Sequence, residues 1–322
     1  GMYPPDHGFA SAFATCFFPI SLFLIYLTRR FMRAGAQRFS TITGKGYRPH
    51  VISLGKWRYP AFSVFIVYTL LTVIAPFLML VWASLLPSYE VPSRSALQVV
   101  SLSSYARVLG DSRVLASVAN TLLVTVATAT LTMFIALGIA WVVVRSKMLG
   151  RGLLDAISFL PQAIPSVVIA IALIFLYSRP PLGSLPIYGT VGIIILGLTT
   201  TYLAFGSRTM NGAIVQVSKE LEEAACVSGA SRTKTLLRIT FPLVLPAFMS
   251  GWIWVAAHAM RAFSIPLILA SHDSELIAVR LWDLWETGDA AEASALGVLF
   301  ILILSSLTMA GRWLVVRLTP QR

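Results

Sequence analysis

Residues 219–242 read KELEEAACVSGASRTKTLLRITFP, and they form the longest charged stretch between two long apolar runs. Ser218 is placed to cap a helix whose first turn is acidic, which suits the unpaired N–H groups and the dipole at a helix N-terminus. Gly229 is placed to end that helix. Ser231 is placed to cap a second, basic helix, which Pro242 is expected to end. This helix pair is too polar for lipid and is tethered at both ends, so it predicts a docking element for a soluble partner.

The remainder of the chain is predominantly apolar. Of its 322 residues 57% are hydrophobic and only 12% are charged, and the mean hydropathy is +0.80, a balance that soluble domains of this length seldom reach. Runs long enough to cross a bilayer, about 20 residues each, occur seven times. The sequence therefore predicts an all-α integral membrane protein with about seven transmembrane helices, near 9–28, 61–86, 117–144, 153–177, 187–206, 243–270 and 294–316.

The net charge of +12 sits in short segments between the apolar runs, as the positive-inside rule predicts, and this argues against a nucleic-acid partner. Eight basic residues and no acidic residue follow the first run, between positions 29 and 58. We therefore expect the N-terminus outside, residues 219–242 and the C-terminus in the cytoplasm, and the acidic loop 271–293 outside. Cys16 and Cys226 suggest neither a disulfide nor a zinc site.

The docking stretch resembles the EAA loop of the permease subunits of binding-protein-dependent ABC importers. The family pattern is E-A-A, three residues, G, nine residues and I-x-L-P, and this chain keeps every spacing, with Phe241 where Leu is usual. The resemblance implies the type I ABC importer permease fold, with one six-helix unit after one N-terminal helix and a coupling loop at about 208–242. The residues that it assigns to ATPase coupling are Glu222, Glu223, Ala224, Ala225, Gly229, Ile239 and Pro242.

The same resemblance implies partners and a location. These are a cytoplasmic ABC ATPase dimer, a periplasmic or lipid-anchored substrate-binding protein, a second permease half or a second copy of this chain, and the lipid of a bacterial inner membrane. The chain carries no G-x-x-x-x-G-K-[ST] phosphate-binding loop, so ATP hydrolysis is expected in a partner and not in this subunit. No cofactor and no metal site are expected.

The segments TITGKGYRP (41–49) and LGKWRYPA (54–61) resemble the junction in iron(III)-type permeases that fuse two homologous halves. That resemblance implies residues 1–28 as a remnant helix of a first half, 29–59 as a basic cytoplasmic linker and 60–322 as a six-helix permease domain. It favours iron(III) as substrate, with phosphonate, thiamine or polyamine as related solutes. The linker is equally typical of a juxtamembrane segment that faces anionic lipid, and both interpretations can hold together.

Four polar residues in the predicted spans are candidates for the substrate pathway: Arg261, His258, Ser264 and Gln162. An arginine at the bilayer centre costs about 2.5–3.5 kcal/mol, so it usually faces the bundle or water. Arg261 either lines the pathway and meets an anionic or chelated substrate, or bonds helix-end carbonyls or extends to the outer surface. Gln162 lies between Pro161 and Pro165, whose expected kink forms a gate or is an ordinary feature of a transmembrane helix.

The outer segment 276–288 is expected to form a short helix that docks a binding protein or anchors at the interface. The alternative function is a secondary transporter or channel that works without ATP, which would be favoured by acids buried in mid-span and by an inverted repeat. An intramembrane enzyme would need a nucleophile–base set or a metal cluster. The sequence presents neither set of features.

Overall fold

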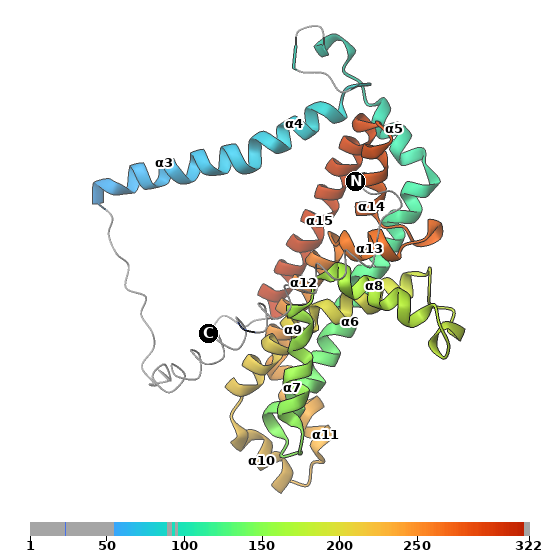
Figure 1. The fold of residues 1–322 in the computed structure, drawn as a ribbon. Helices are drawn as coiled ribbons and strands as arrows, with labels where there is room; N and C mark the ends of the chain where they lie inside the picture. The colour runs from blue at the N-terminus through green and yellow to red at the C-terminus, as the bar shows by residue number, and fades with distance from the viewer. Residues whose placement is uncertain (1–22, 24–54, 89–91, 94–95, 319–322) are drawn as a thin grey trace. The chain divides into compact units, whose positions relative to one another are not determined.

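The computed structural model describes residues 23, 55–88, 92–93 and 96–318, and the regular elements of this part of the chain are all helical (Figure 1). The predicted span near 9–28 and nearly all of the basic linker lie outside the described residues. The helices are α3 (Arg58–Thr69), α4 (Ala75–Ser84), α5 (Ser103–Gly110), α6 (Ser112–Arg145), α7 (Arg151–Phe159), α8 (Ser166–Tyr177), α9 (Val191–Gln216), α10 (Lys219–Val227), α11 (Arg232–Thr235), α12 (Phe241–Met260), α13 (Ser264–Leu269), α14 (Ile277–Glu286) and α15 (Ala290–Leu318).

Within the described residues, five continuous helices are long and apolar enough to cross a membrane, and a bent pair makes a sixth candidate span. They correspond to the six predicted runs that follow the first. The continuous spans are Gly55–Ser84, Ser112–Arg145, Val191–Gln216, Arg232–Met260 and Ala290–Trp313, and the bent pair is Arg151–Ala163 with Ser166–Tyr177.

The chain divides into two compact units, and the larger contains residues 111–283 and 300–318. Its centre is the packing of α6 against α9 and α12. A Cβ atom added at Gly206 of α9 would lie 3.0 Å from the Cβ of Ala136 and 3.2 Å from Cγ2 of Thr132, both on α6. The missing side chain therefore allows the two helices to approach closely, as small residues do in membrane helix pairs.

The smaller unit contains residues 55–110 and 284–299. Its long apolar helix runs through α3, a π-helical turn at Leu70–Ile74 and α4. Tyr105 of α5 bonds the hydroxyl of Ser84 at 2.7 Å, and Nε of Arg107 donates to Glu292 at 2.6 Å. These contacts tie the end of α4, α5 and the start of α15 to one another.

Two predicted spans are interrupted in the structure. The run predicted over 153–177 is two helices that meet at 108°, with Pro161 in a 3₁₀ turn and Pro165 at the start of α8, so the predicted proline kink is confirmed. The prediction of one continuous span over 243–270 was wrong, because α12 ends at Met260 and the separate helix α13 begins at Ser264.

Pro242 does not end the basic helix, and that prediction was wrong. The helix continues from Arg232 to Met260, with Pro242 in the first turn of α12. A π-helical turn at Leu236–Thr240 precedes the proline. Such a wide turn changes the hydrogen-bond register of the backbone, which allows a residue without an N–H group to be accommodated in a continuing helix.

Candidate functional site

The docking stretch forms the predicted helix α10 with both predicted ends. The Ser218 hydroxyl accepts a bond from the backbone N–H of Glu220 at 3.3 Å. At the other end, Ala230 N–H bonds the carbonyl of Ala225 and Gly229 N–H bonds that of Cys226, both at 3.0 Å. Gly229 has φ +81°, so these bonds form the Schellman motif that a glycine C-cap favours. Both sequence predictions are confirmed.

The basic helix follows at once. The Ser231 hydroxyl accepts a bond from the Lys234 N–H at 3.3 Å and caps α11, as predicted. Ile239 lies in the π-helical turn and Pro242 at the start of α12, so these two residues of the pattern lie in the helix that enters the bundle. The E-A-A residues and the end of the pattern are therefore on separate helices joined by the turn at Gly229.

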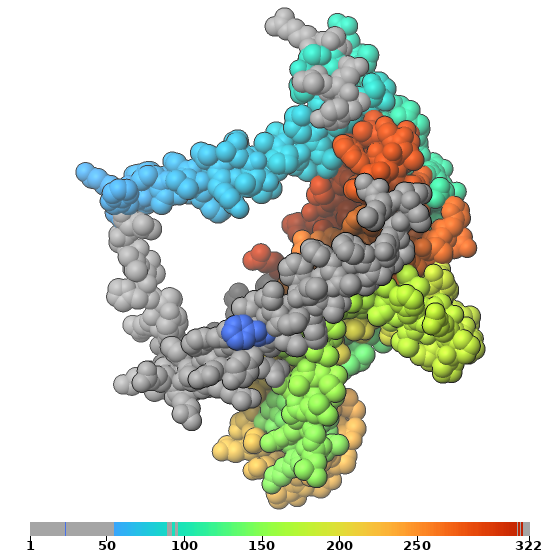
Figure 2. Space-filling model, viewed as in Figure 1, coloured from blue at the N-terminus to red at the C-terminus, as the bar shows by residue number. Residues whose placement is uncertain are grey.

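The surface of α10 is open. The helix contains no buried residue, Glu223 and Ala224 are exposed, and Val227 is 90% exposed. Within the described part of the chain the carboxylate of Glu223 makes no hydrogen bond or ion pair. A Cβ atom at Gly229 would meet nothing within 4 Å. Figure 2 shows this region at the surface of the larger unit.

Glu222 is placed differently from its neighbour. Its Oε1 atom accepts bonds from Nε of Arg145 at 3.0 Å and from the hydroxyl of Thr240 at 2.9 Å. The same arginine donates through Nη2 to the carbonyls of Ile214 at 3.0 Å and Val217 at 2.6 Å. Sequence analysis missed Arg145 and Thr240, because nothing in the local pattern shows which distant residue meets a glutamate.

Two cavities adjoin α10. One of about 310 Å³ lies between the end of α6 and the two short helices, and Arg145, Glu222, Glu223 and Cys226 are among the residues that line it. The second, of about 660 Å³, lies between α9 and the start of α12 and reaches Leu221 of α10. Helix α10 thus contacts the bundle at a few points and leaves space on both sides.

Three of the four predicted pathway residues gather near one another. The His258 ring stacks on Trp254 at 3.7 Å, and Trp254 stacks on Phe205 at 3.6 Å. Tyr202 meets the Trp254 ring edge-on at 6.2 Å and the His258 ring at 6.4 Å. Trp254 and His258, one turn apart, therefore share a face of α12, whereas α12 ends before Arg261.

Arg261 is exposed at the C-terminal end of α12, and its charge is close enough to act on the Tyr202 phenol. Within the described residues its guanidinium makes no hydrogen bond or ion pair. Ser264 lines a cavity of about 200 Å³ together with Tyr202, Thr201 and Ser166. Gln162 is exposed in the 3₁₀ turn between α7 and α8 and does not line this cavity.

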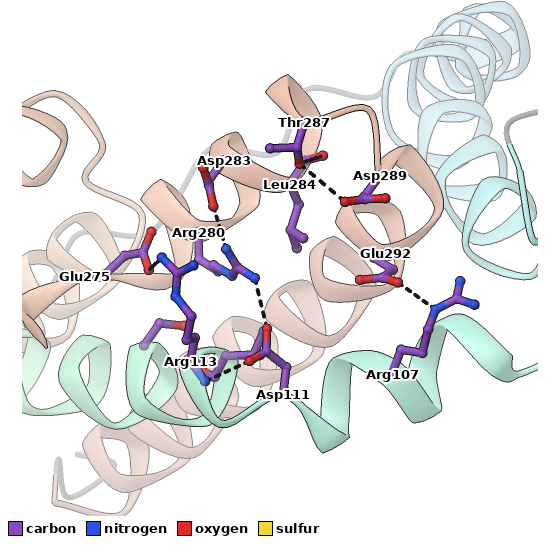
Figure 3. A network of polar contacts seen from close by, with 12 residues as sticks. Arg107, Asp111, Arg113, Glu275, Arg280, Asp283, Leu284, Thr287, Asp289 and Glu292 are labelled. Atoms are coloured by element: carbon purple, nitrogen blue, oxygen red, sulfur yellow. Dashed lines mark hydrogen bonds and ion pairs between the residues drawn. The ribbon is translucent and has the colours of Figure 1, made fainter. Parts of the chain in front are cut away.

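The helix predicted within 276–288 is confirmed as α14, and polar bonds fasten its N-terminal part to α6 (Figure 3). Arg280, a residue that is 8% exposed, donates through its guanidinium to Asp111 at 2.9 Å and also to Asp283. Burial raises the pKa of Asp111, but bonds from the Arg113 N–H and from Arg280, with the charges of both arginines, outweigh burial and leave that pKa below its ordinary value.

The segment that leads into α14 is fastened in the same way. Asn120 of α6 donates to the carbonyls of Asp273 at 2.9 Å and Glu275 at 3.2 Å, and the Ile277 N–H bonds the Thr121 hydroxyl at 2.9 Å. The described residues contain no group of three or more His, Cys, Asp or Glu side chains that could hold a metal ion. The polar bonds link parts of the chain that are distant in sequence.

Comparison with known proteins places this geometry in a family. The family described as "Binding-protein-dependent transport system inner membrane component" matches residues 132–322. A ferric transport system permease protein, FbpB of Actinobacillus pleuropneumoniae, is 26% identical over 313 residues, which cover 96% of this chain and 44% of that protein. A probable sulfate transport system permease protein, cysT of Nephroselmis olivacea, is 33% identical over 187 residues, 55% of this chain and 66% of that protein.

Solved structures share the fold. A bacterial ABC transporter that imports the polysaccharide alginate aligns with a TM-score of 0.67 and 18% identity, over 82% of this chain and 96% of that one. The inward-facing methionine transporter MetNI aligns with a TM-score of 0.52 and 16% identity, over 63% and 94%. The predicted ABC importer permease fold is confirmed. With the family match over more than half of its length, the chain belongs to the inner membrane components of binding-protein-dependent transport systems.

Proposed function

We propose that this chain is the membrane-spanning permease subunit of an ATP-driven importer, and that α10 receives the movement of a separate cytoplasmic ATPase dimer. The observation that carries the proposal is the E-A-A pattern on a helix that buries no residue and is fixed at both ends. Glu223 presents an unpaired carboxylate for a charge-assisted bond to the partner. Ala224 permits close approach, and Gly229 provides the turn.

The proposed assembly needs more than this chain. Residues 60–322 supply one six-helix unit, 29–59 a cytoplasmic linker and 1–28 an additional helix whose N-terminus is outside. A second permease half or a second copy completes the pathway, and a periplasmic or lipid-anchored binding protein delivers the substrate to the outer face. The orientation follows the basic residues, because Arg145, Lys147 and Arg151 lie at the same end as α10.

Arg261 belongs, in this proposal, to the outer part of the pathway. Trp252 bonds Thr130 of α6, and the Asp273 carbonyl bonds Asn120 of α6. Arg261 lies between Trp252 and Asp273 in sequence, so we place it at the level of residues 120–130 of α6. These positions lie 15 to 25 residues along the helix from Arg145, the last residue of α6. At 1.5 Å per residue this is about 23–37 Å. The hydrocarbon core is about 30 Å thick. Arg261 would therefore lie near its outer boundary, where an exposed charge costs less than at the centre.

The substrate is proposed to be iron(III) or a related small solute. Relatives are named as ferric and as sulfate permeases, and the junction-like linker favours the ferric group. The aromatic residues around His258, with Arg261 and the cavity at Ser264, provide stacking surfaces and positive charge for an anionic or chelated form. Phosphonate, thiamine and polyamine are the alternative substrates. In the same proposal Gln162, at the bend between α7 and α8, is a gate residue.

The experiment is co-purification and transport with the partner ATPase of this chain. Glu223→Ala and Gly229→Val should leave the protein inserted in the membrane, reduce the amount of ATPase that co-purifies and abolish uptake. Glu220→Gln, an exposed acid on the same helix, is the matched control and should behave as wild type. Normal uptake and normal ATPase binding by Gly229→Val would overturn the assignment of α10.

A further inference from the structure

The Arg145 guanidinium is a point where four parts of the larger unit meet. Arg145 is the last residue of α6, Ile214 and Val217 are at the end of α9, Glu222 is on α10, and Thr240 directly precedes α12. Four hydrogen bonds of 2.6–3.0 Å join these groups through the arginine and the glutamate. One ion pair therefore connects α10 with three membrane helices.

The burial of this pair separates it from ordinary surface ion pairs. The Arg145 side chain is 7% exposed and that of Glu222 is 16% exposed, and their Nε and Oε1 atoms are 3.0 Å apart. A buried charge must keep its partners, because leaving one uncompensated is costly. The carbonyls that Arg145 binds are at the C-terminus of α9, where the helix dipole favours a positive charge.

Between its two fixed ends, α10 is linked to the membrane helices by this pair. No residue of α10 is buried, so apolar packing contributes little to its position. The planar guanidinium reaches Glu222 and the two carbonyls of α9 at the same time, which an ammonium group cannot do with the same geometry. Glu222 and Glu223 thus differ in their contacts: the carboxylate of Glu222 is bonded to Arg145 and Thr240, whereas Glu223 is exposed and its carboxylate makes no bond to the described residues.

We infer that Arg145 is a positioning residue that carries movement of α10 into α6, α9 and α12 together. Force on α10 reaches Glu222, passes to the guanidinium and through it to the ends of α6 and α9, and reaches α12 through the Thr240 hydroxyl. The inference rests on the proposed function, in which an ATPase supplies that force. Glu222, which the resemblance assigned to ATPase coupling, is then an internal joint and not a contact of the ATPase.

The test uses the full chain reconstituted in proteoliposomes with its ATPase, its binding protein and the second permease half or second copy that completes the pathway. The variants are Arg145→Lys, Arg145→Ala and Glu222→Gln, with Glu220→Gln as control. ATPase co-purification, ATP hydrolysis and substrate uptake are measured together. All variants should retain the ATPase, because the outward face of α10 is unchanged. Uptake per ATP hydrolysed should fall roughly tenfold or more in both Arg145 variants, the effect expected from losing a charge-assisted bond.

Glu222→Gln keeps an acceptor oxygen for Arg145 and Thr240, so its loss should be smaller than that of either Arg145 variant. A merely structural role would lower uptake and ATP hydrolysis in proportion and leave their ratio unchanged, and that result would overturn the inference. If Arg145→Ala fails to insert, Arg145→Lys and Glu222→Gln still decide the question. If the wild-type chain binds no ATPase, the proposed function fails first and this inference falls with it.

Discussion

Gly229 offers a graded test of the turn that ends α10. Its φ of +81° is unfavourable for residues with a side chain, and a Cβ atom would meet nothing within 4 Å. The cost of a substitution is therefore conformational and not steric. For an L-residue other than glycine this cost is about 1–2 kcal/mol, and asparagine tolerates the conformation better than alanine or valine.

Such a cost corresponds to a change of about 5- to 30-fold in the population of the closed turn. The bonds that report it are Gly229 N–H to Cys226 and Ala230 N–H to Ala225. Hydrogen exchange at these two amides should become about 5- to 30-fold faster in Gly229→Ala, faster still in Gly229→Val, and only slightly faster in Gly229→Asn. Uptake should fall in the same order, because the same turn holds α10 for the ATPase.

The control is Gly212→Ala, a helical glycine of α9 at which a Cβ atom would also meet nothing within 4 Å. It should change neither exchange at the turn nor uptake. Equal effects of Gly229→Asn and Gly229→Val would refute the conformational explanation, since these residues differ mainly in their tolerance of positive φ. Unchanged exchange in Gly229→Val would refute the Schellman motif itself.

Three further predictions concern the rest of the larger unit. Gly206→Val should destabilise the protein by about 1–3 kcal/mol, because its side chain would enter the α6–α9 contact, whereas Gly212→Ala should not; thermal unfolding in detergent measures both. The folded protein lowers the pKa of Asp111, so its bond to Arg280 should stabilise the segment around α14 fully at pH values above the ordinary carboxyl pKa of 3.8. This stabilisation should be lost as the pH falls through the lower pKa of the folded state. Trp282 fluorescence measured against pH should show the transition in the wild type but not in Asp111→Asn. Arg261→Ala should reduce uptake severalfold while Arg261→Lys retains most of it, and unchanged kinetics in both would favour an anchoring role at the outer surface.

Local sequence patterns predicted the helix ends, the spans and the bend, because each of these depends on residues that are close together in the sequence. Ser218 and Ser231 lie at helix N-caps and Gly229 at a C-cap, because a short side chain or the absence of one acts on the adjoining backbone. Seven apolar runs predicted spans because the bilayer sets their length, and the six that fall on described residues correspond to candidate spans. The bend at Pro161 and Pro165 followed from the missing N–H groups.

Contacts between distant residues were not predicted. Arg145 and Glu222 are separated by 77 positions, and Asn120 and Asp273 by 153, so no sequence window contains both partners. The prediction that Pro242 ends the basic helix was wrong, because a π-helical turn before the proline changes the hydrogen-bond register of the backbone. Such turns have no simple sequence signal. The break after Met260 was missed because the apolar composition continues through it into α13.

The most direct test of the central claim asks on which side of the membrane α10 lies and what covers it. Val227 is 90% exposed at the end of α10, so Val227→Cys in a chain with Cys16→Ser and Cys226→Ser provides one accessible thiol. A membrane-impermeant maleimide should label it in inverted vesicles but not in intact cells, and bound ATPase should protect it. Labelling in intact cells, or labelling of inverted vesicles that the ATPase does not diminish, would contradict the account.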